Sequence, residues 1–145
     1  MDAIGLIKQF EGLSLKPYLC SAGLATIGYG HVITENGKAL KKLDGLQPIT
    51  KEKAEDYLKT DIEKFRKQLD SLSLNLNHNQ YEALVSFIFN IGFGQFKDST
   101  LLYRIKNGAD KKGIEEAFLM WVKSGGKVLN GLVKRRKAEA ALFNL

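Results

Sequence analysis

Cysteine is almost absent from this chain of 145 residues, and the single Cys20 cannot form a disulfide within the molecule. Many secreted domains of this size depend on several disulfides, so we expect folding in a reducing cytoplasm. Long apolar runs are also missing, and residues 1–12, which carry Asp2, do not resemble a signal peptide. We therefore expect neither a signal peptide nor stable insertion into a membrane.

Motifs for metals and nucleotides are missing as well. No cluster of cysteine and histidine has the spacing of metal ligands, and no glycine-rich phosphate loop is followed by Lys and Ser or Thr. We expect no metal and no other cofactor. The two histidines stand apart, and we expect His31 to be structural and His78 to be solvated.

Positive charge is concentrated in the last third of the chain. The net charge is +6, and residues 104–145 account for all of it, with ten Lys or Arg against four Asp or Glu. Such a field attracts polyanions, which include nucleic acids, anionic lipids and the acidic polymers of a bacterial envelope. No base-reading motif or aromatic platform accompanies the charge, so we expect no nucleic acid as partner.

Apolar periodicity predicts a mostly helical α+β chain. A first helix is expected over residues 2–12, and short segments between glycines predict a small β-meander over 17–32. Residues 33–48 are expected to form a polar loop, followed by a long helix over 50–72. Further helices are predicted over 81–91, 99–107 and 111–123, and Asn130 is expected to cap a last helix that ends near residue 143.

This order of elements predicts a single domain over residues 1–145 with two lobes. The small lobe covers about 13–49, and the helical lobe covers about 73–145 together with the first helix. The helix over 50–72 connects them, and a helix of about twenty residues is roughly 30 Å long.

Glu11 stands at the end of the first helix, directly before a glycine. The negative end of the helix dipole disfavours a carboxylate there and so favours the protonated form, which a general acid needs. Position alone fits a solvated glutamate better. However, Cys20 and Thr26 flank the predicted hairpin turn, and Glu11 can face both, although each also has an ordinary structural role as a small buried residue or a strand former.

The spacing of Glu11, Cys20 and Thr26 resembles the catalytic triad of phage-type lysozymes, glycoside hydrolase family 24. In that family the middle residue is aspartate or, less often, cysteine. Further stretches match in the same order: TIGYGH at 26–31, ALVSFIFNIG at 83–92, FKDSTLL at 96–102, and GGKVL through GLVKRR at 125–136 with Glu139. The resemblance runs from residue 7 to residue 143.

The resemblance implies a lysozyme-like two-lobed fold and hydrolysis of the β-1,4 bond between N-acetylmuramic acid and N-acetylglucosamine in peptidoglycan. Glu11 would protonate the glycosidic oxygen, and Thr26 would hold the attacking water or orient the sugar. Cys20 would activate the water as a thiolate or position it as a thiol, and the ordinary thiol pKa of about 8.5 favours the second role.

The resemblance also implies cleft residues, which are Gly30, Val32, Phe89, Asn90 and Ser99. The basic run over 134–137 could supply an arginine to Glu11. On a helix, Arg136 shares a face with Glu139, while Arg135 flanks that face, so we expect Arg136 to be the partner and keep Arg135 as the alternative. Such a pair would favour the ionised carboxyl and oppose the helix dipole.

Two other functions stay open. A catalytically silent peptidoglycan-binding module would fit the replacement of an acid by Cys20, and a membrane-active C-terminal helix would fit the basic run. For the enzyme, the resemblance implies a monomeric endolysin that is made in the host cytoplasm and lyses the cell. A separate holin would release it to the peptidoglycan of the periplasm.

Overall fold

The computed structural model describes residues 1–145. Helix α1 (Ala3–Glu11) begins after Asp2, whose carboxylate accepts a hydrogen bond from the Gly5 amide at 2.8 Å. It ends at Gly12, which has a φ of +71° and so adopts a conformation that favours glycine. The predicted first helix is confirmed, and it delivers Glu11 to the edge of the small sheet.

The predicted meander is a three-stranded antiparallel sheet. It consists of β1 (Ser14–Leu19), β2 (Ala25–Gly28) and β3 (His31–Val32), in that order. Thr26 in the middle strand stands opposite Tyr18 on one side and Val32 on the other. The register therefore gathers residues of all three strands around Thr26.

The segment predicted as a plain loop contains a further small hairpin, β4 (Thr34–Glu35) and β5 (Lys38–Ala39). Asn36 and Gly37 both have positive φ, at 52° and 77°, and this tight turn brings the flanking residues into register. The expectation of a loop over 33–48 is therefore wrong at this point.

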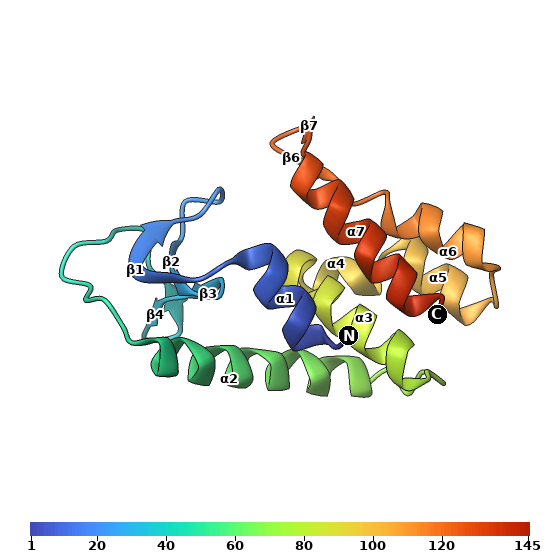
Figure 1. Ribbon diagram of the computed structural model, residues 1–145, viewed down its shortest axis with the longest axis horizontal. Helices are drawn as coiled ribbons and strands as arrows, with labels where there is room; N and C mark the ends of the chain where they lie inside the picture. The colour runs from blue at the N-terminus through green and yellow to red at the C-terminus, as the bar shows by residue number, and fades with distance from the viewer.

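Helix α2 (Lys51–Asp70) connects the small sheet to the helical lobe. It starts at Thr50, whose hydroxyl accepts a hydrogen bond from the Lys53 amide. Figure 1 shows it at the bottom of the view, running beneath both the sheet and α1. Its buried side chains follow the apolar stripe of the sequence and face the core: Ala54, Leu58, Ile62 and Leu69.

Helix α3 (His78–Ile91) forms the centre of the helical lobe. Asn77 and Gln80 form a capping box at its start, and every residue from 82 to 88 is buried. Around it lie α4 (Phe93–Lys97), α5 (Thr100–Lys106), α6 (Lys111–Phe118) and α7 (Asn130–Phe143). The aromatic ring of Phe87 packs edge-on against those of Phe96 and Phe118 in the core of this lobe.

The segment before α7 differs from the prediction. Helix α6 ends at Phe118 instead of near residue 123, because the chain then pairs as the hairpin β6 (Lys123–Ser124) and β7 (Lys127–Val128). Gly125 and Gly126, both with positive φ, make the turn. Asn130 is the first residue of α7 rather than its cap, and the capping residue Leu129 makes no side-chain bond.

None of the helices combines the length and the apolar character needed to cross a membrane.

Candidate active site

The carboxyl group of Glu11 is held from two sides. Its Oε2 accepts a hydrogen bond from Nη1 of Arg135 at 2.5 Å. On the other side lies the backbone of Gly30, so close that a Cβ on this residue would stand 2.8 Å from Oε1. The Glu11 side chain is 21% exposed, so the carboxyl can be reached from solvent but has little freedom to move.

Three grooves lie around this carboxyl, and together we call them the cleft. One groove contains Glu11 itself with Asn90, Leu132 and Arg135, and it continues into a second that reaches from Ser21 in the β1–β2 turn to Trp121. A third lies between the sheet, α2 and α3, and is lined by Gly30, His31, Val32, Thr34, Asp61, Lys64, Phe65 and Phe89. The cleft thus lies where the small sheet faces the helices.

Four of the five predicted glycan-binding residues line this cleft. Gly30, Val32 and Phe89 share the third groove, and Asn90 belongs to the other two. Ser99 does not: it is 7% exposed and caps α5. Its hydroxyl donates to the Phe96 carbonyl at 2.7 Å and accepts from the Leu102 amide. The side chain is thus used as a helix cap, and glycan binding by Ser99 stays a prediction.

Cys20 and Thr26 lie together across the β1–β2 turn, as predicted. Burial alone would raise the pKa of the Cys20 thiol, but hydrogen bonds from the Leu24 and Ala22 backbone and from the Thr26 hydroxyl outweigh it, so the pKa lies below its ordinary value. The same hydroxyl lies 2.9 Å from the Leu24 carbonyl. Its one proton can therefore serve the carbonyl or the sulfur.

Tyr18 is a neighbour that the sequence reasoning missed. Burial raises the pKa of its phenol, and the negative charges of Glu11 and Cys20 raise it further, which shows that the ring lies near both. The strand alternation offers a signal, since residues 18 and 20 fall on the same side of a strand. Its partner across the sheet is Thr26.

The arginine that pairs with Glu11 is Arg135, so the expectation of Arg136 is wrong. Helix α7 contacts both α1 and α3. Arg136 points toward α3, where its guanidinium donates to Asn90 and lies 4.9 Å from the centroid of the Phe87 ring. The flank that carries Arg135 faces α1 and hence Glu11. Adjacent residues on a helix point about 100° apart, so Arg135 can face α1 while Arg136 faces α3.

Glu139 joins the two arginines in the interior. It is completely buried and accepts hydrogen bonds from Ser86 Oγ at 2.6 Å, Arg136 Nη1 at 2.5 Å and Arg135 Nε at 3.3 Å. Burial raises the pKa of Glu139 and lowers the pKa of Arg136 to about 10, which still leaves the guanidinium protonated at neutral pH. Two arginines and two glutamates thus balance one another behind the cleft.

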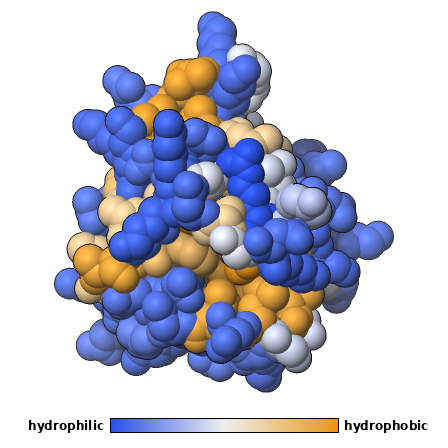
Figure 2. Space-filling view, turned by 90° about the vertical axis from the view of Figure 1, so that its right-hand side faces the viewer, coloured by the Kyte–Doolittle hydropathy of each residue, from blue (hydrophilic) through white to orange (hydrophobic).

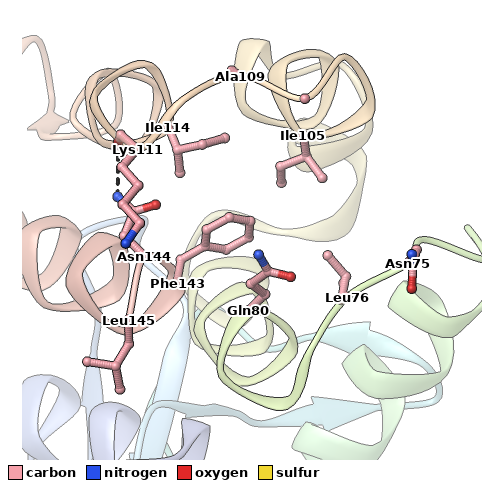
Figure 3. Close-up of a pocket in the computed structure, with 11 residues that line it drawn as sticks. Asn75, Leu76, Gln80, Ile105, Ala109, Lys111, Ile114, Phe143, Asn144 and Leu145 are labelled. Carbon is pink, nitrogen blue, oxygen red and sulfur yellow. Dashed lines mark hydrogen bonds between the residues drawn. The ribbon is translucent and has the colours of Figure 1, made fainter.

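A separate hollow lies at the far end of the helical lobe, away from Glu11 (Figure 3). Phe143 stands at its centre, with Ile105, Ile114 and Leu76 around it, and no acidic side chain or thiol lines it. Figure 2 views this end of the molecule, where hydrophobic areas are scattered among hydrophilic ones. This hollow therefore offers no carboxylic side chain that could act as a general acid.

Comparisons with known proteins agree with this geometry. The model of the family described as "Phage lysozyme" matches residues 8–139. The chain is 44% identical to the endolysin of Bacillus phage B103 over 143 residues, which cover 97% of this chain and 51% of the relative. It is 40% identical to the endolysin of Salmonella phage P22 over 143 residues, which cover 98% and 94%.

The chain thus spans about half the length of the Bacillus phage relatives and nearly all of the P22 endolysin. Among solved structures, the endolysin from Escherichia coli O157:H7 phage FAHEc1 superposes with a TM-score of 0.80 at 39% identity, covering 97% of this chain and 89% of that one. A P22 lysozyme mutant gives 0.76 at 38% identity, with 97% and 94% covered. The predicted lysozyme-like α+β fold is confirmed.

Proposed function

Because this chain belongs to the phage lysozyme family, we propose that it hydrolyses the β-1,4 bond between N-acetylmuramic acid and N-acetylglucosamine in bacterial peptidoglycan. The observation that carries the proposal is the carboxyl of Glu11, fixed in the cleft between Arg135 and Gly30. A carboxyl group at the surface of a groove between two lobes can reach the oxygen that joins two sugars.

The proposed reaction uses Glu11 as general acid. The carboxyl proton passes to the glycosidic oxygen while the bond from that oxygen to the anomeric carbon breaks, and the sugar develops positive charge. Water then adds to the anomeric carbon and loses a proton. Arg135 keeps the carboxyl in one place, which matters because catalysis depends on sub-ångström positioning.

Thr26 and Cys20 are proposed to hold the attacking water. Thr26 is fixed in the middle strand at 3% exposure, so its hydroxyl is a rigid partner. The lowered pKa of Cys20 increases the thiolate fraction and supports a second step in which the sulfur takes the proton that water releases.

The two competing functions are less well supported. A membrane-active C-terminal helix would need its basic run exposed, but Arg135 and Arg136 are 3% and 0% exposed and paired with carboxylates. A silent binding module would have no need of an acid clamped against a backbone. Both of these functions predict that a chain without the acid at position 11 keeps its effect on bacteria.

The test is Glu11→Gln, with Glu115→Gln as a matched control. Glu115 is exposed on α6, so the control makes the same chemical change far from the cleft. We expect E11Q to abolish release of reducing sugars from purified peptidoglycan and clearing of outer-membrane-permeabilised bacteria, while E115Q behaves as the unmodified chain. Equal cutting by E11Q would reject the proposal, and binding without cutting by the unmodified chain would favour the module.

We also propose that a separate membrane pore gives the enzyme access to the periplasmic peptidoglycan. The support is the resemblance to endolysins alone. Expression in bacteria with and without a co-expressed holin tests it, and lysis at the same rate without a holin would contradict it.

A further inference from the structure

The turn between β2 and β3 determines how much room the Glu11 carboxyl has. Its residues Gly28 and Gly30 both have positive φ, 67° and 76°, and Tyr29 between them is 7% exposed. On one side the turn packs on α2 so closely that a Cβ on Gly28 would lie 3.2 Å from the Cβ of Ala54. On the other side Gly30 lies against Glu11. A shift of this turn would therefore loosen or crowd the carboxyl.

Glu55 on α2 joins the turn to α1. Its Oε1 accepts hydrogen bonds from the Tyr29 hydroxyl at 3.2 Å and from Lys8 Nζ at 2.8 Å, and its Oε2 lies 2.7 Å from the same ammonium. The ammonium also lies 5.3 Å from the centroid of the Tyr29 ring, within the range of a cation–π contact. Lys8, Tyr29 and Glu55 thus form one contact group from three elements, which we call the clasp.

The clasp keeps its charges and its phenolic proton at neutral pH. The hydrogen bond between Lys8 and Glu55 holds the pKa of the carboxyl below its ordinary value and raises the pKa of the ammonium. Burial raises the pKa of Tyr29, so its hydroxyl stays a donor. The Lys8 and Glu55 side chains are 35% and 28% exposed, and such a pair adds little to the stability of a fold. The effect of the clasp is therefore expected in the geometry that it fixes.

Helix α1 carries both one end of the clasp and the acid. Lys8 and Glu11 are three residues apart and so lie on the same side of the helix, one turn from each other. The helix itself packs against α3 and α7 in the helical lobe, whereas the turn belongs to the small sheet. The clasp is thus a tie between the two lobes at one helical turn from the acid.

We propose that Glu55 is a positioning residue, which through the clasp keeps the Gly30 backbone against the Glu11 carboxyl. Glu55 lines none of the three grooves of the cleft. Without the clasp the turn is free to move back, and the carboxyl gains orientations in which it does not reach the glycosidic oxygen. The chemical step then slows while the glycan still binds in the grooves, so kcat falls and KM changes little. This inference rests on the proposed function.

Each link of the clasp can be broken by one substitution. Tyr29→Phe removes the hydroxyl and keeps the ring in the core, Lys8→Met removes the ammonium, and Glu55→Leu removes the carboxylate. With soluble, dye-labelled peptidoglycan as substrate, we expect each variant to lose about tenfold in kcat, which corresponds to roughly one hydrogen bond, with KM within about twofold. Because the links act in series, Tyr29→Phe combined with Glu55→Leu should lose no more than either alone. A loss of about a hundredfold in that double variant would overturn the proposal.

Tyr103→Phe and Lys8→Arg are the matched controls. Tyr103 is 69% exposed on α5, so its variant makes the same chemical change outside the clasp and should keep the kcat of the unmodified chain. Arginine at position 8 can still pair with Glu55 and should keep most of the kcat. Equal kcat values for Tyr29→Phe and Tyr103→Phe would overturn the proposal, and so would a loss in Lys8→Arg as large as in Lys8→Met.

A Gly30→Ala background separates positioning from a merely structural role. There the added Cβ already displaces the Glu11 carboxyl, and a loosened turn gives that Cβ room. We therefore expect Tyr29→Phe to leave the kcat of Gly30→Ala unchanged or to raise it. A further tenfold fall in this background would show that the Tyr29 hydroxyl acts by another route.

Folding of each variant is checked by thermal unfolding, and if Glu55→Leu does not fold, Tyr29→Phe and its control Tyr103→Phe still decide. Failure of this inference is distinguishable from failure of the proposed function. An unmodified chain that cuts no peptidoglycan rejects the enzyme, whereas a chain that cuts and whose Tyr29→Phe variant keeps its kcat rejects only the positioning role.

Discussion

Adding one methyl group at Gly30 should disable the cleft while leaving the chain folded. In the structure, a Cβ on Gly30 would lie 2.8 Å from Oε1 and 3.1 Å from Cδ of Glu11, whereas ordinary contacts start at 3.4 Å. The backbone of Gly30 is fixed by its place before β3, so the carboxyl is the group that moves. It must retreat by about 0.6 Å, the difference between 3.4 and 2.8 Å.

The retreat is blocked on the other side by Arg135, which already lies 2.5 Å from Oε2. The carboxyl therefore has to rotate out of its clamp. A misplacement of about 1 Å can cost a hundredfold in rate, so we expect kcat/KM of Gly30→Ala to fall about 10- to 100-fold. The positive φ of 76° adds a loss of about 1–2 kcal/mol in stability, because alanine is strained in that conformation.

Gly37→Ala separates the two effects. Gly37 has nearly the same φ, 77°, but nothing lies within 4 Å of its Cβ position. It should lose a similar free energy of unfolding in urea and keep its activity. Cutting of purified peptidoglycan by Gly30→Ala at a rate within twofold of Gly37→Ala would refute the reasoning, because Glu11 would then not depend on the clamp.

Three further predictions address the site and its support. Alkylation of Cys20, verified as complete by mass spectrometry, should block cutting because the added bulk fills the place of the attacking water, and full activity would place the thiol outside the reaction. Cys20→Ser should keep measurable activity over pH 6–9. Near-complete loss of activity in this variant would show that the thiolate is required. Arg135→Ala should lower the free energy of unfolding by about 3–5 kcal/mol, since it leaves Glu139 and Glu11 without a shared partner, and thermal unfolding beside Lys134→Ala, an exposed neighbour, checks it. Burial favours the protonated form of Glu82, but Arg66 and the Ala3 amide outweigh it and hold the pKa of its carboxyl below the ordinary value. As the pH drops, the unfolded chain therefore binds the proton before the folded chain does, and the free energy of unfolding falls. Glu82→Gln should be less stable at pH 7 by about 1–3 kcal/mol and should lose less stability between pH 5 and 3 in urea titrations, and an unchanged slope would contradict the sign.

Local chemistry made several parts of the fold predictable. Asp2, Thr50 and the Asn77–Gln80 capping box begin helices by bonds that reach only three residues along the chain. Gly12 ends the first helix because its own backbone adopts a positive φ, which is also a local effect. Cys20 and Thr26 meet because one hairpin turn joins their strands. The end of α6 was missed because the β6–β7 hairpin competes with the helix.

The ion-pair partner of Glu11 could not be predicted from such local chemistry. Arg135 is 124 residues away, and its contact exists only because α7 lies against α1 as well as α3. Periodicity gives the angle between Arg135 and Arg136 but not the direction in which the helix faces. The same holds for Ser99, which matches a cleft position by resemblance and is used inside as a cap. The starts of the helices can be read from the sequence, since their capping bonds lie within one turn, whereas the pairing of the charges depends on how distant helices pack.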